Sequence, residues 1–278
     1  MACHLDPSPA LDAAWLAGVR AQAAREPLRP RVPLRWQSHV IGSVENEFLA
    51  QPALRSALPR QGLVQCSDQG WHIEGAQLSD SLAVLANAMR EAGLTGAWRN
   101  EQLAVRDASQ ALVGTVERGA VRPLGIATQA VHLVGLSPDG RHWVQQRAHD
   151  KATDPGLWDT LMGGMAPACD TPMQALARET WEEAGLRMDQ LMQLRVGGSF
   201  TVRRPSQDAR NAGYVVERVD WWRCVLADGV TPVNQDGEVQ QFALMTSSEL
   251  RRRLLAGEFT LEAMLALTDG DPPALLQG

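Results

Sequence analysis

Residues 163–186 read GGMAPACDTPMQALARETWEEAGL, and this stretch decides how the chain is interpreted. It predicts a helix with marked ends. Thr171 suits the N-cap, Pro172 suits the first helical position, and Gln174 completes a capping box with Thr171. Gly185 suits the left-handed residue that follows a helix. We therefore expect a helix over residues 172–184.

Three acidic residues gather near the end of this helix. Glu179, Glu182 and Glu183 are three or four positions apart and share one side of the helix. Like charges at this spacing destabilise a helix by roughly 0.2–0.5 kcal/mol per pair, and the helix dipole disfavours negative charge at its C-terminus. Mg²⁺ would remove both penalties, because it takes oxygen ligands and binds phosphate groups. The adjacent Arg178 can hold one carboxylate by a bidentate bond. The alternative is a solvated acidic patch.

The stretch resembles the Nudix box, G-x5-E-x7-R-E-U-x-E-E-x-G-U, where U is an aliphatic residue. The core R-E-x-x-E-E-x-G, residues 178–185, is intact. Two positions depart from the pattern: Asp170 stands for the first glutamate, and Thr180 stands for an aliphatic residue. Asp170 keeps the charge, whereas Thr180 is expected to weaken the packing beneath the helix slightly.

The resemblance implies an α/β fold, the Nudix α/β/α sandwich with a mixed sheet, preceded here by a smaller α+β N-terminal domain. It implies that Glu179, Glu182 and Glu183 are catalytic and ligate Mg²⁺ or Mn²⁺, with the carbonyl of Gly163 as a further ligand. Arg178 would orient the glutamates. One glutamate of the box is expected to act as the general base, although some family members place the base elsewhere. The implied reaction is hydrolysis of a P–O–P bond in a small-molecule diphosphate.

A softer likeness extends along the chain. Residues 146–159, with Gln146-Arg147, Lys151 and the run PGLWD, are similar to isopentenyl-diphosphate isomerases and their hydrolase relatives. Residues 232–239 and 257–259, together with 98–101 and 131–133, resemble the group related to the Nudix half of fungal thiamine pyrophosphokinases. That likeness implies thiamine diphosphate or its oxidised analogues as the favoured substrate. ADP-ribose, a nucleotide sugar and coenzyme A remain alternatives.

Four residues outside the box are candidates for the site. Arg147 and Lys151 precede the box and are expected to grip the diphosphate, the alternative being solvated surface cations. Glu238 is a candidate metal ligand or base, or a plain loop acid. Trp158 is a candidate to stack on an aromatic substrate ring, or else a buried tryptophan. His132 lies within an apolar strand and is interpreted as a core histidine.

Two other functions remain open. An isopentenyl-diphosphate isomerase needs a reactive cysteine shortly after Trp158, but residues 160–163 are Thr-Leu-Met-Gly and the next cysteine is Cys169. We therefore do not favour the isomerase. A non-enzymatic diphosphate sensor is the second alternative, and the complete acidic core of the box argues against it.

The segment VRPLG, residues 121–125, is expected to mark a boundary between an N-terminal accessory domain (1–123) and the domain that resembles a Nudix hydrolase (124–278). Hydrophobic periodicity and turn residues predict the elements. The expected helices are 11–19, 81–92 and 248–256, and the expected strands are 98–105, 129–136, 142–147, 197–203, 215–226 and 240–244. Trp221 and Trp222 should point to opposite faces of their strand.

Composition limits the remaining possibilities. The chain has 278 residues, 45% of them hydrophobic, and a formal net charge of −6, which disfavours a nucleic-acid binder. We expect no membrane span and, from the opening MACHLDP, no secretory signal. The four cysteines stand far apart, so free thiols and a cytoplasmic location are expected. A homodimer is possible, although no interface is readable.

Overall fold

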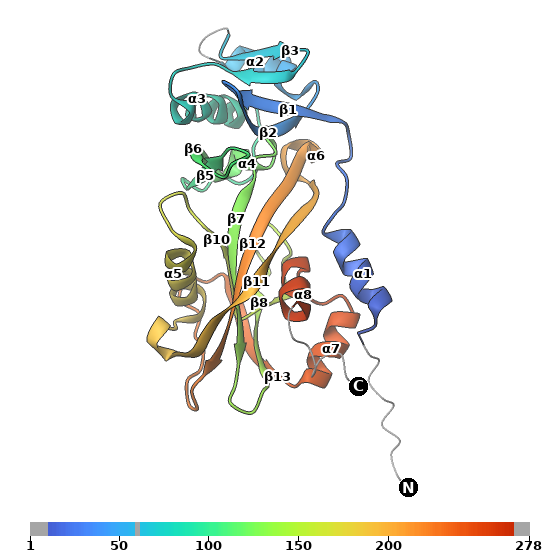
Figure 1. Ribbon diagram of the computed structural model, residues 1–278, viewed down its shortest axis with the longest axis vertical. Helices are drawn as coiled ribbons and strands as arrows, with labels where there is room; N and C mark the ends of the chain where they lie inside the picture. Colours follow the sequence, from blue (N-terminus) through green and yellow to red (C-terminus); the bar gives the residue numbers. More distant parts are fainter. Residues whose placement is uncertain (1–10, 59–61, 270–278) are drawn as a thin grey trace.

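The computed structural model describes residues 11–58 and 62–269, so Cys3 and the opening MACHLDP lie outside the description. Figure 1 shows two units stacked along the longest axis, an N-terminal unit (residues 31–123) and a C-terminal unit (residues 124–269). None of the helices in the described ranges combines the length and the apolar character that crossing a membrane requires. Among the described cysteines, Cys66, Cys169 and Cys224 are free thiols.

The N-terminal unit is an α+β arrangement. A four-stranded sheet has the order β2-β1-β4-β3, and a separate hairpin joins β5 to β6. The elements are β1 (Arg31–Trp36), β2 (His39–Glu45), η1 (Phe48–Ala50), α2 (Pro52–Ala57), β3 (Val64–Ser67), β4 (Gly70–Ile73), α3 (Leu78–Glu91), β5 (Gln102–Arg106), β6 (Leu112–Glu117) and α4 (Arg118–Val121). One apolar cluster that includes Leu34, Leu82 and Leu103 forms its core.

The C-terminal unit is built on a seven-stranded mixed sheet of order β11-β12-β7-β8-β13, with β10 paired to β7 and β9 paired to β8. Strand β12 runs parallel to β7, and the other pairs are antiparallel. The elements are β7 (Thr128–Leu136), β8 (His142–Arg147), β9 (Trp158–Asp159), β10 (Met162–Met165), α5 (Pro172–Ala184), η2 (Met188–Gln190), β11 (Leu191–Ser206), α6 (Asp208–Asn211), β12 (Gly213–Leu226), β13 (Val239–Met245), α7 (Ser247–Leu255) and α8 (Leu261–Thr268).

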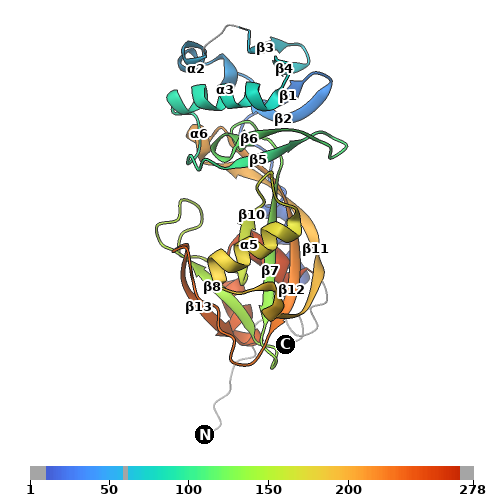
Figure 2. The ribbon, with the colours of Figure 1, turned by 90° about the vertical axis from the view of Figure 1, so that its left-hand side faces the viewer.

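Helices cover both faces of this sheet (Figures 1 and 2). Helix α5 packs on one face through Leu176, in an apolar cluster that also holds Trp222. Helices α7 and α8 pack on the other face, in a cluster that holds Trp221. The expected α/β/α sandwich with a mixed sheet is therefore confirmed, as is the prediction that the two tryptophans face opposite sides.

Strand β7 changes partner along its length. Its residues Ala130 to Leu133 pair with β10, whereas only Gly135 and Leu136 pair with β8. The sheet therefore divides between β10 and β8. Side chains from both sides of this division reach a common cleft, which is described below.

Helix α1 (Ala13–Gln22) packs against the C-terminal unit, although the boundary expected at residue 123 would place it in the N-terminal domain. Its Val19 packs in the same cluster as Val202 and Val215 of the C-terminal unit. The next turn joins β11, because the backbone N–H of Arg203 donates to the carbonyl of Ala23 at 2.7 Å. By packing, the first described residues belong to the C-terminal unit, and the N-terminal unit begins at β1.

The strand predicted over residues 98–105 is wrong in its first half, because β5 begins at Gln102. Asn100 has a φ of +55°, a left-handed conformation outside the extended region of regular strands. Its side-chain oxygen accepts a hydrogen bond from the indole of Trp98 at 2.9 Å. Residues 98–101 thus form a bent, irregular segment that leads into the strand.

Candidate active site

Helix α5 is fixed at both ends. At its start, Gln174 and Thr171 form the expected capping box, with the Gln174 side chain accepting from the Thr171 backbone N–H at 2.9 Å. At its end, Gly185 has a φ of +63°. The backbone N–H of Val233 donates to the carbonyl of Ala184 at 2.8 Å, so a distant loop satisfies one of the last carbonyls. These contacts hold the acidic turn of α5 in a defined orientation.

The glycine pair of β10 lets α5 and β7 approach this strand closely. A Cβ atom on Gly164 would lie 2.2 Å from the carboxyl carbon of Glu179, and one on Gly163 would lie 2.6 Å from the ring of His132. Any side chain at either position would displace a neighbour. The two glycines therefore place the backbone of β10 directly beside the carboxylate of Glu179.

Glu183 and Glu179 carry the carboxylates of α5 that line the cleft, the first buried and the second partly buried. Glu183 is 3% exposed, and its Oε2 accepts hydrogen bonds from the Gln145 side chain at 2.8 Å and from the Gly163 backbone at 3.1 Å. Burial, followed by the charge of Glu179, raises the pKa of Glu183 to about 8. Burial likewise raises the pKa of Glu179 to about 7, although Arg178 opposes the shift. Both groups thus lie where a positive charge would be stabilised.

Arg178 connects the acids of the box. Its Nη1 donates to Glu179 at 3.0 Å and to Glu182 at 2.9 Å, and its Nε donates to Asp170 at 3.0 Å. The side chain of Glu182 is 42% exposed and does not line the cleft. Asp170 therefore serves to hold the arginine that restrains two of the glutamates.

The three acids expected to bind metal do not gather at one point. Among residues 11–58 and 62–269, no group of three or more His, Cys, Asp or Glu side chains could hold a metal ion. Like charges repel at close range, and Arg178 holds Glu182 away from Glu183. The donor set still fits a hard divalent cation, since the carboxylates of Glu179 and Glu183 and the Gly163 carbonyl are oxygen donors. Glu182 would have to turn away from Arg178 to join them.

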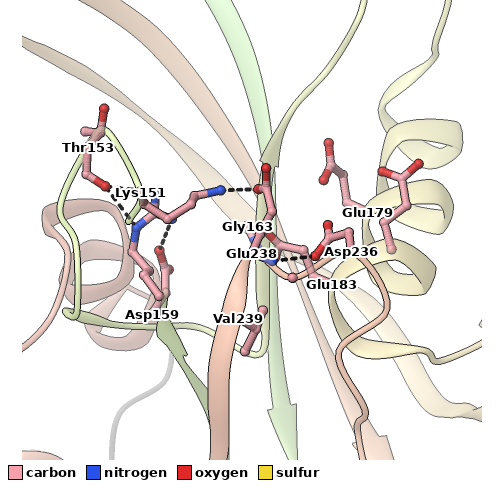
Figure 3. Close-up of polar contacts among 12 residues, drawn as sticks. Lys151, Thr153, Asp159, Gly163, Glu179, Glu183, Asp236, Glu238 and Val239 are labelled. Carbon is pink, nitrogen blue, oxygen red and sulfur yellow. Dashed lines mark hydrogen bonds and ion pairs between the residues drawn. The ribbon is translucent and has the colours of Figure 1, made fainter. Parts of the chain in front are cut away.

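The opposite wall of the site carries cations. Lys151 forms an ion pair with Glu238, and both line the cleft. Burial raises the pKa of Glu238, but the hydrogen bond and charge of Lys151 outweigh it, so the pKa of Glu238 is lowered. Arg147 donates to the carbonyl of Thr153 at 3.1 Å and lies 3.6 Å from Asp159. Figure 3 shows Lys151 and Glu238 on the side facing Glu183 and Glu179 of α5.

Trp158 and His132 are both buried, but only His132 lines the cleft. Trp158 is 7% exposed, packs in the apolar cluster that holds Phe259, and is not among the lining residues of the cleft. The guanidinium of Arg253 lies 5.2 Å from the centre of its ring. His132 is buried, with Nδ1 3.0 Å from Thr160 Oγ1, and it contributes to the floor of the cleft.

One cavity of about 340 Å³, which we call the carboxylate cleft, is lined by Glu179, Glu183, Gly163, Arg147, Lys151, Glu238 and His132. The N-terminal unit contributes to its wall through Arg99, Glu101, Arg118 and Arg122. No site role was predicted for residues 98–101 from the sequence. Two acids of the C-terminal unit that line the cleft, Glu217 and Glu262, were also not predicted. Glu217 gave no clear signal in the sequence, because the same strand also contains Arg218, Asp220 and Arg223.

Several known proteins resemble this chain over more than half of its length. The protein YJR142W of Saccharomyces cerevisiae is 27% identical over 194 residues, covering 64% of this chain and 56% of that protein. An isopentenyl-diphosphate Delta-isomerase of Streptomyces avermitilis is 27% identical over 168 residues, covering 60% of this chain and 81% of the isomerase. The crystal structure of DR0079 from Deinococcus radiodurans aligns with a TM-score of 0.47 at 23% identity, covering 60% of this chain and 97% of that one.

This chain spans about half the length of several curated relatives, the yeast protein among them. Residues 127–266 match the family described as the NUDIX domain. The match covers the whole mixed sheet, helix α5 and both faces of the carboxylate cleft in the C-terminal unit. It spans half of the chain, and the chain therefore belongs to the Nudix family.

Proposed function

We propose that the protein is a Mg²⁺- or Mn²⁺-dependent pyrophosphohydrolase that cleaves the P–O–P bond of a substituted diphosphate. The observation that carries the proposal is the placement of two carboxylates of α5, the buried Glu183 and the partly buried Glu179, opposite cations across one cleft. Membership of the Nudix family supports it. Thiamine diphosphate or its oxidised analogues are the favoured substrates.

Each residue has an assigned task. A divalent cation, when bound, neutralises charge that develops on the phosphates and acidifies a water molecule. Glu179, Glu183 and the Gly163 carbonyl would hold it, and Glu182 would join after leaving Arg178. Arg178 keeps Glu179 oriented through its 3.0 Å hydrogen bond.

Lys151 and Arg147 would meet the phosphate oxygens, since both line the cleft opposite α5. Lys151 must then exchange Glu238 for phosphate, which would free the Glu238 carboxylate. A box glutamate takes the proton of the attacking water, and the released Glu238 is the second candidate for that task.

The positions of the described cysteines disfavour the isomerase alternative. Cys169 is exposed and lies outside the lining of the carboxylate cleft, and no cysteine is among the lining residues within the described chain. A thiol that protonates or deprotonates a substrate must be within hydrogen-bond reach of it. The match to an isomerase sequence therefore reflects a shared scaffold.

A substrate panel tests the function. Full-length protein with Mg²⁺ is given thiamine diphosphate, oxythiamine diphosphate and ADP-ribose, and the products are identified by mass. We expect conversion of a thiamine-type diphosphate to its monophosphate. Preferential cleavage of ADP-ribose would transfer the assignment to the alternative substrate class. No Mg²⁺-dependent cleavage of any diphosphate would leave the non-catalytic sensor as the function.

Glu183→Gln provides the matched variant. Glutamine keeps an oxygen that accepts from Gln145 and from the Gly163 backbone, so the fold should persist. Loss of the anionic donor should lower kcat/KM by at least about 100-fold. Glu249→Gln, on the surface of α7 and outside the cleft, should retain full activity. Full activity of Glu183→Gln would contradict the assignment.

A further inference from the structure

Glu217 of β12 is a buried carboxylate that the proposed reaction does not use. It is 8% exposed and lines the carboxylate cleft. Within residues 11–58 and 62–269 its side chain accepts no hydrogen bond. A buried carboxylate without such a partner is costly to the fold, and groups of this kind gather at binding and catalytic sites.

The positive groups near Glu217 only partly offset the effects of burial and of the neighbouring negative charge on its carboxylate. Glu262 of α8 repels it and, after burial, is the main cause of its raised pKa. Arg122, His132 and Arg118 attract it more weakly.

The nearby cations also have other partners. Arg122 lies 3.3 Å from Asp208, Arg118 lies 2.8 Å from Glu101, and Arg204 lies 3.5 Å from Glu262. Within the described residues Glu217 therefore has no ion pair of its own, although it is buried and lines the cleft.

Glu217 is too far along the sheet to act on the diphosphate itself. It is paired across the sheet with Thr128, whereas Gly163, beside the α5 carboxylates, is paired with His132 on the same strand β7. Four residues of an extended strand span roughly 13 Å between backbone positions. A substrate whose diphosphate lies at α5 would therefore bring its organic half to Glu217.

We propose that Glu217, together with Glu262, binds a positively charged nitrogen group in the organic half of the substrate. The proposal rests on the function proposed above and narrows the substrate class to diphosphates of cationic nitrogen compounds. A cation between the two carboxylates removes their mutual repulsion and stabilises the buried charge. The same pair would exclude diphosphates whose organic half is anionic.

Two diphosphates that differ only in charge test this inference. Thiamine diphosphate carries a cationic thiazolium ring, and 3-deazathiamine diphosphate is its neutral isostere. The dissociation constants of both compounds are measured by calorimetry with Mg²⁺ in two full-length proteins. The first is Glu183→Gln, in which turnover is suppressed. The second carries Glu217→Gln in addition to Glu183→Gln. We expect the Glu183→Gln protein to bind the cationic compound at least about ten-fold more tightly, and the double variant to lose most of that preference.

Further variants separate recognition from folding. Glu217→Asp keeps the charge and should retain more of the preference than Glu217→Gln. Glu249→Gln should leave the preference unchanged. The inference would be overturned if the double variant with Glu217→Gln still bound the cationic compound more tightly. It would also be overturned if the Glu183→Gln protein bound the two compounds equally.

Hydrolysis by the wild-type protein distinguishes this inference from the proposed function. If neither compound is cleaved but the preference depends on Glu217, the inference stands and the hydrolase assignment falls. If cleavage occurs and no preference is found, the hydrolase assignment stands and the inference falls. Failure to bind either compound would also overturn the inference.

Discussion

Glu183 combines deep burial with two hydrogen-bond donors, and Glu179 lies close enough to repel it. Hydrogen bonds from Gln145 and Gly163 favour the ionised form, yet burial and Glu179 dominate and the pKa rises. A carboxylate pair in this state is unfavourable for the fold in the absence of a cation. That imbalance is what a divalent ion would relieve, since ligands must be deprotonated to bind it.

This imbalance predicts how the stability of the metal-free protein depends on pH. The pKa values of Glu179 and Glu183 are about 7 and about 8 in the fold, above the ordinary 4.5. Between these limits the folded state binds more protons than the unfolded state, so their contribution to stability falls as pH rises from 4.5 to about 8. Urea unfolding with a chelator, repeated across this range, measures the slope.

Glu183→Gln removes one of these titrating groups and should flatten that slope. Mg²⁺ should stabilise the wild-type protein more at pH 8 than at pH 5, because only the ionised carboxylates bind it. Glu249→Gln, away from the cleft, should reproduce the wild-type slope. An identical slope in the wild-type and Glu183→Gln proteins would contradict the pKa assignments.

At the scale of the element, helix α5 contains one residue that its packing does not favour. Thr180 is fully buried, and its Oγ1 has no hydrogen-bond partner among the described residues. An unsatisfied buried hydroxyl costs about 1–3 kcal/mol. Thr180→Val, which has nearly the same shape, should therefore raise the free energy of unfolding by about 1 kcal/mol.

Urea unfolding monitored by circular dichroism would show that gain as a higher midpoint with an unchanged slope. Thr171→Ala, in contrast, should destabilise the same helix. It removes the capping side chain and should lower the free energy of unfolding by about 1 kcal/mol. A destabilising Thr180→Val would mean that the hydroxyl is satisfied in solution.

The elements that the sequence predicted well have strong local signals. Helix α5 has the predicted bounds because Thr171, Pro172 and Gly185 mark its ends with side-chain and backbone chemistry. Strands β7 and β8 agree closely because a turn at residues 137–140 separates two apolar runs. Local signals of this kind act within a few residues and survive without tertiary context.

Other elements have no such local signal. Helix α8 was missed because the run LEAMLALT is apolar on nearly all sides and shows no amphipathic period. The N-terminal sheet was missed because its strands are short, and β1 and β2 are interrupted by Pro33 and Gly42. These elements depend on packing against distant segments, which the sequence alone does not reveal.

The candidate site was predictable only in part, for the same reason. The box identified Glu179, Glu183 and Arg178, because their spacing on one helix is local. That Glu182 turns to Arg178 and away from the cleft depends on side-chain repulsion. Glu217 comes from a distant strand, and only its burial beside the same cavity identifies it.

At the scale of the whole molecule, Arg31 ties the two units together. From β1 its guanidinium donates to the carbonyl of Ala212 at 2.6 Å and to that of Pro123 at 2.9 Å, and it also contacts Ser43. Burial lowers the pKa of Arg31 to about 10, and the group remains charged. The contacts hold the N-terminal unit over the hairpin of β11 and β12, beside the cleft to which it contributes four side chains.

Arg31→Met should therefore loosen the joint between the units. It leaves several carbonyls without donors and should lower the free energy of unfolding by about 2–3 kcal/mol. Limited proteolysis should cut the connection at residues 122–127 faster than in the wild-type protein. Arg29→Met is the matched control, because Arg29 is mostly exposed and contacts only Glu45 at 2.7 Å among the interactions described. Equal proteolysis of both variants would contradict a role of Arg31 in joining the units.

The most direct test of the central claim is the position of bound metal. Crystals of the full-length protein, soaked with Mn²⁺ and a non-hydrolysable methylene analogue of thiamine diphosphate, would give anomalous difference density at each metal ion. We predict density within about 2–2.6 Å of carboxylate oxygens of Glu179 and Glu183, with phosphate oxygens on the far side of the ion. An ordered analogue with no anomalous density beside α5 would contradict the claim that these carboxylates hold a divalent cation against a diphosphate.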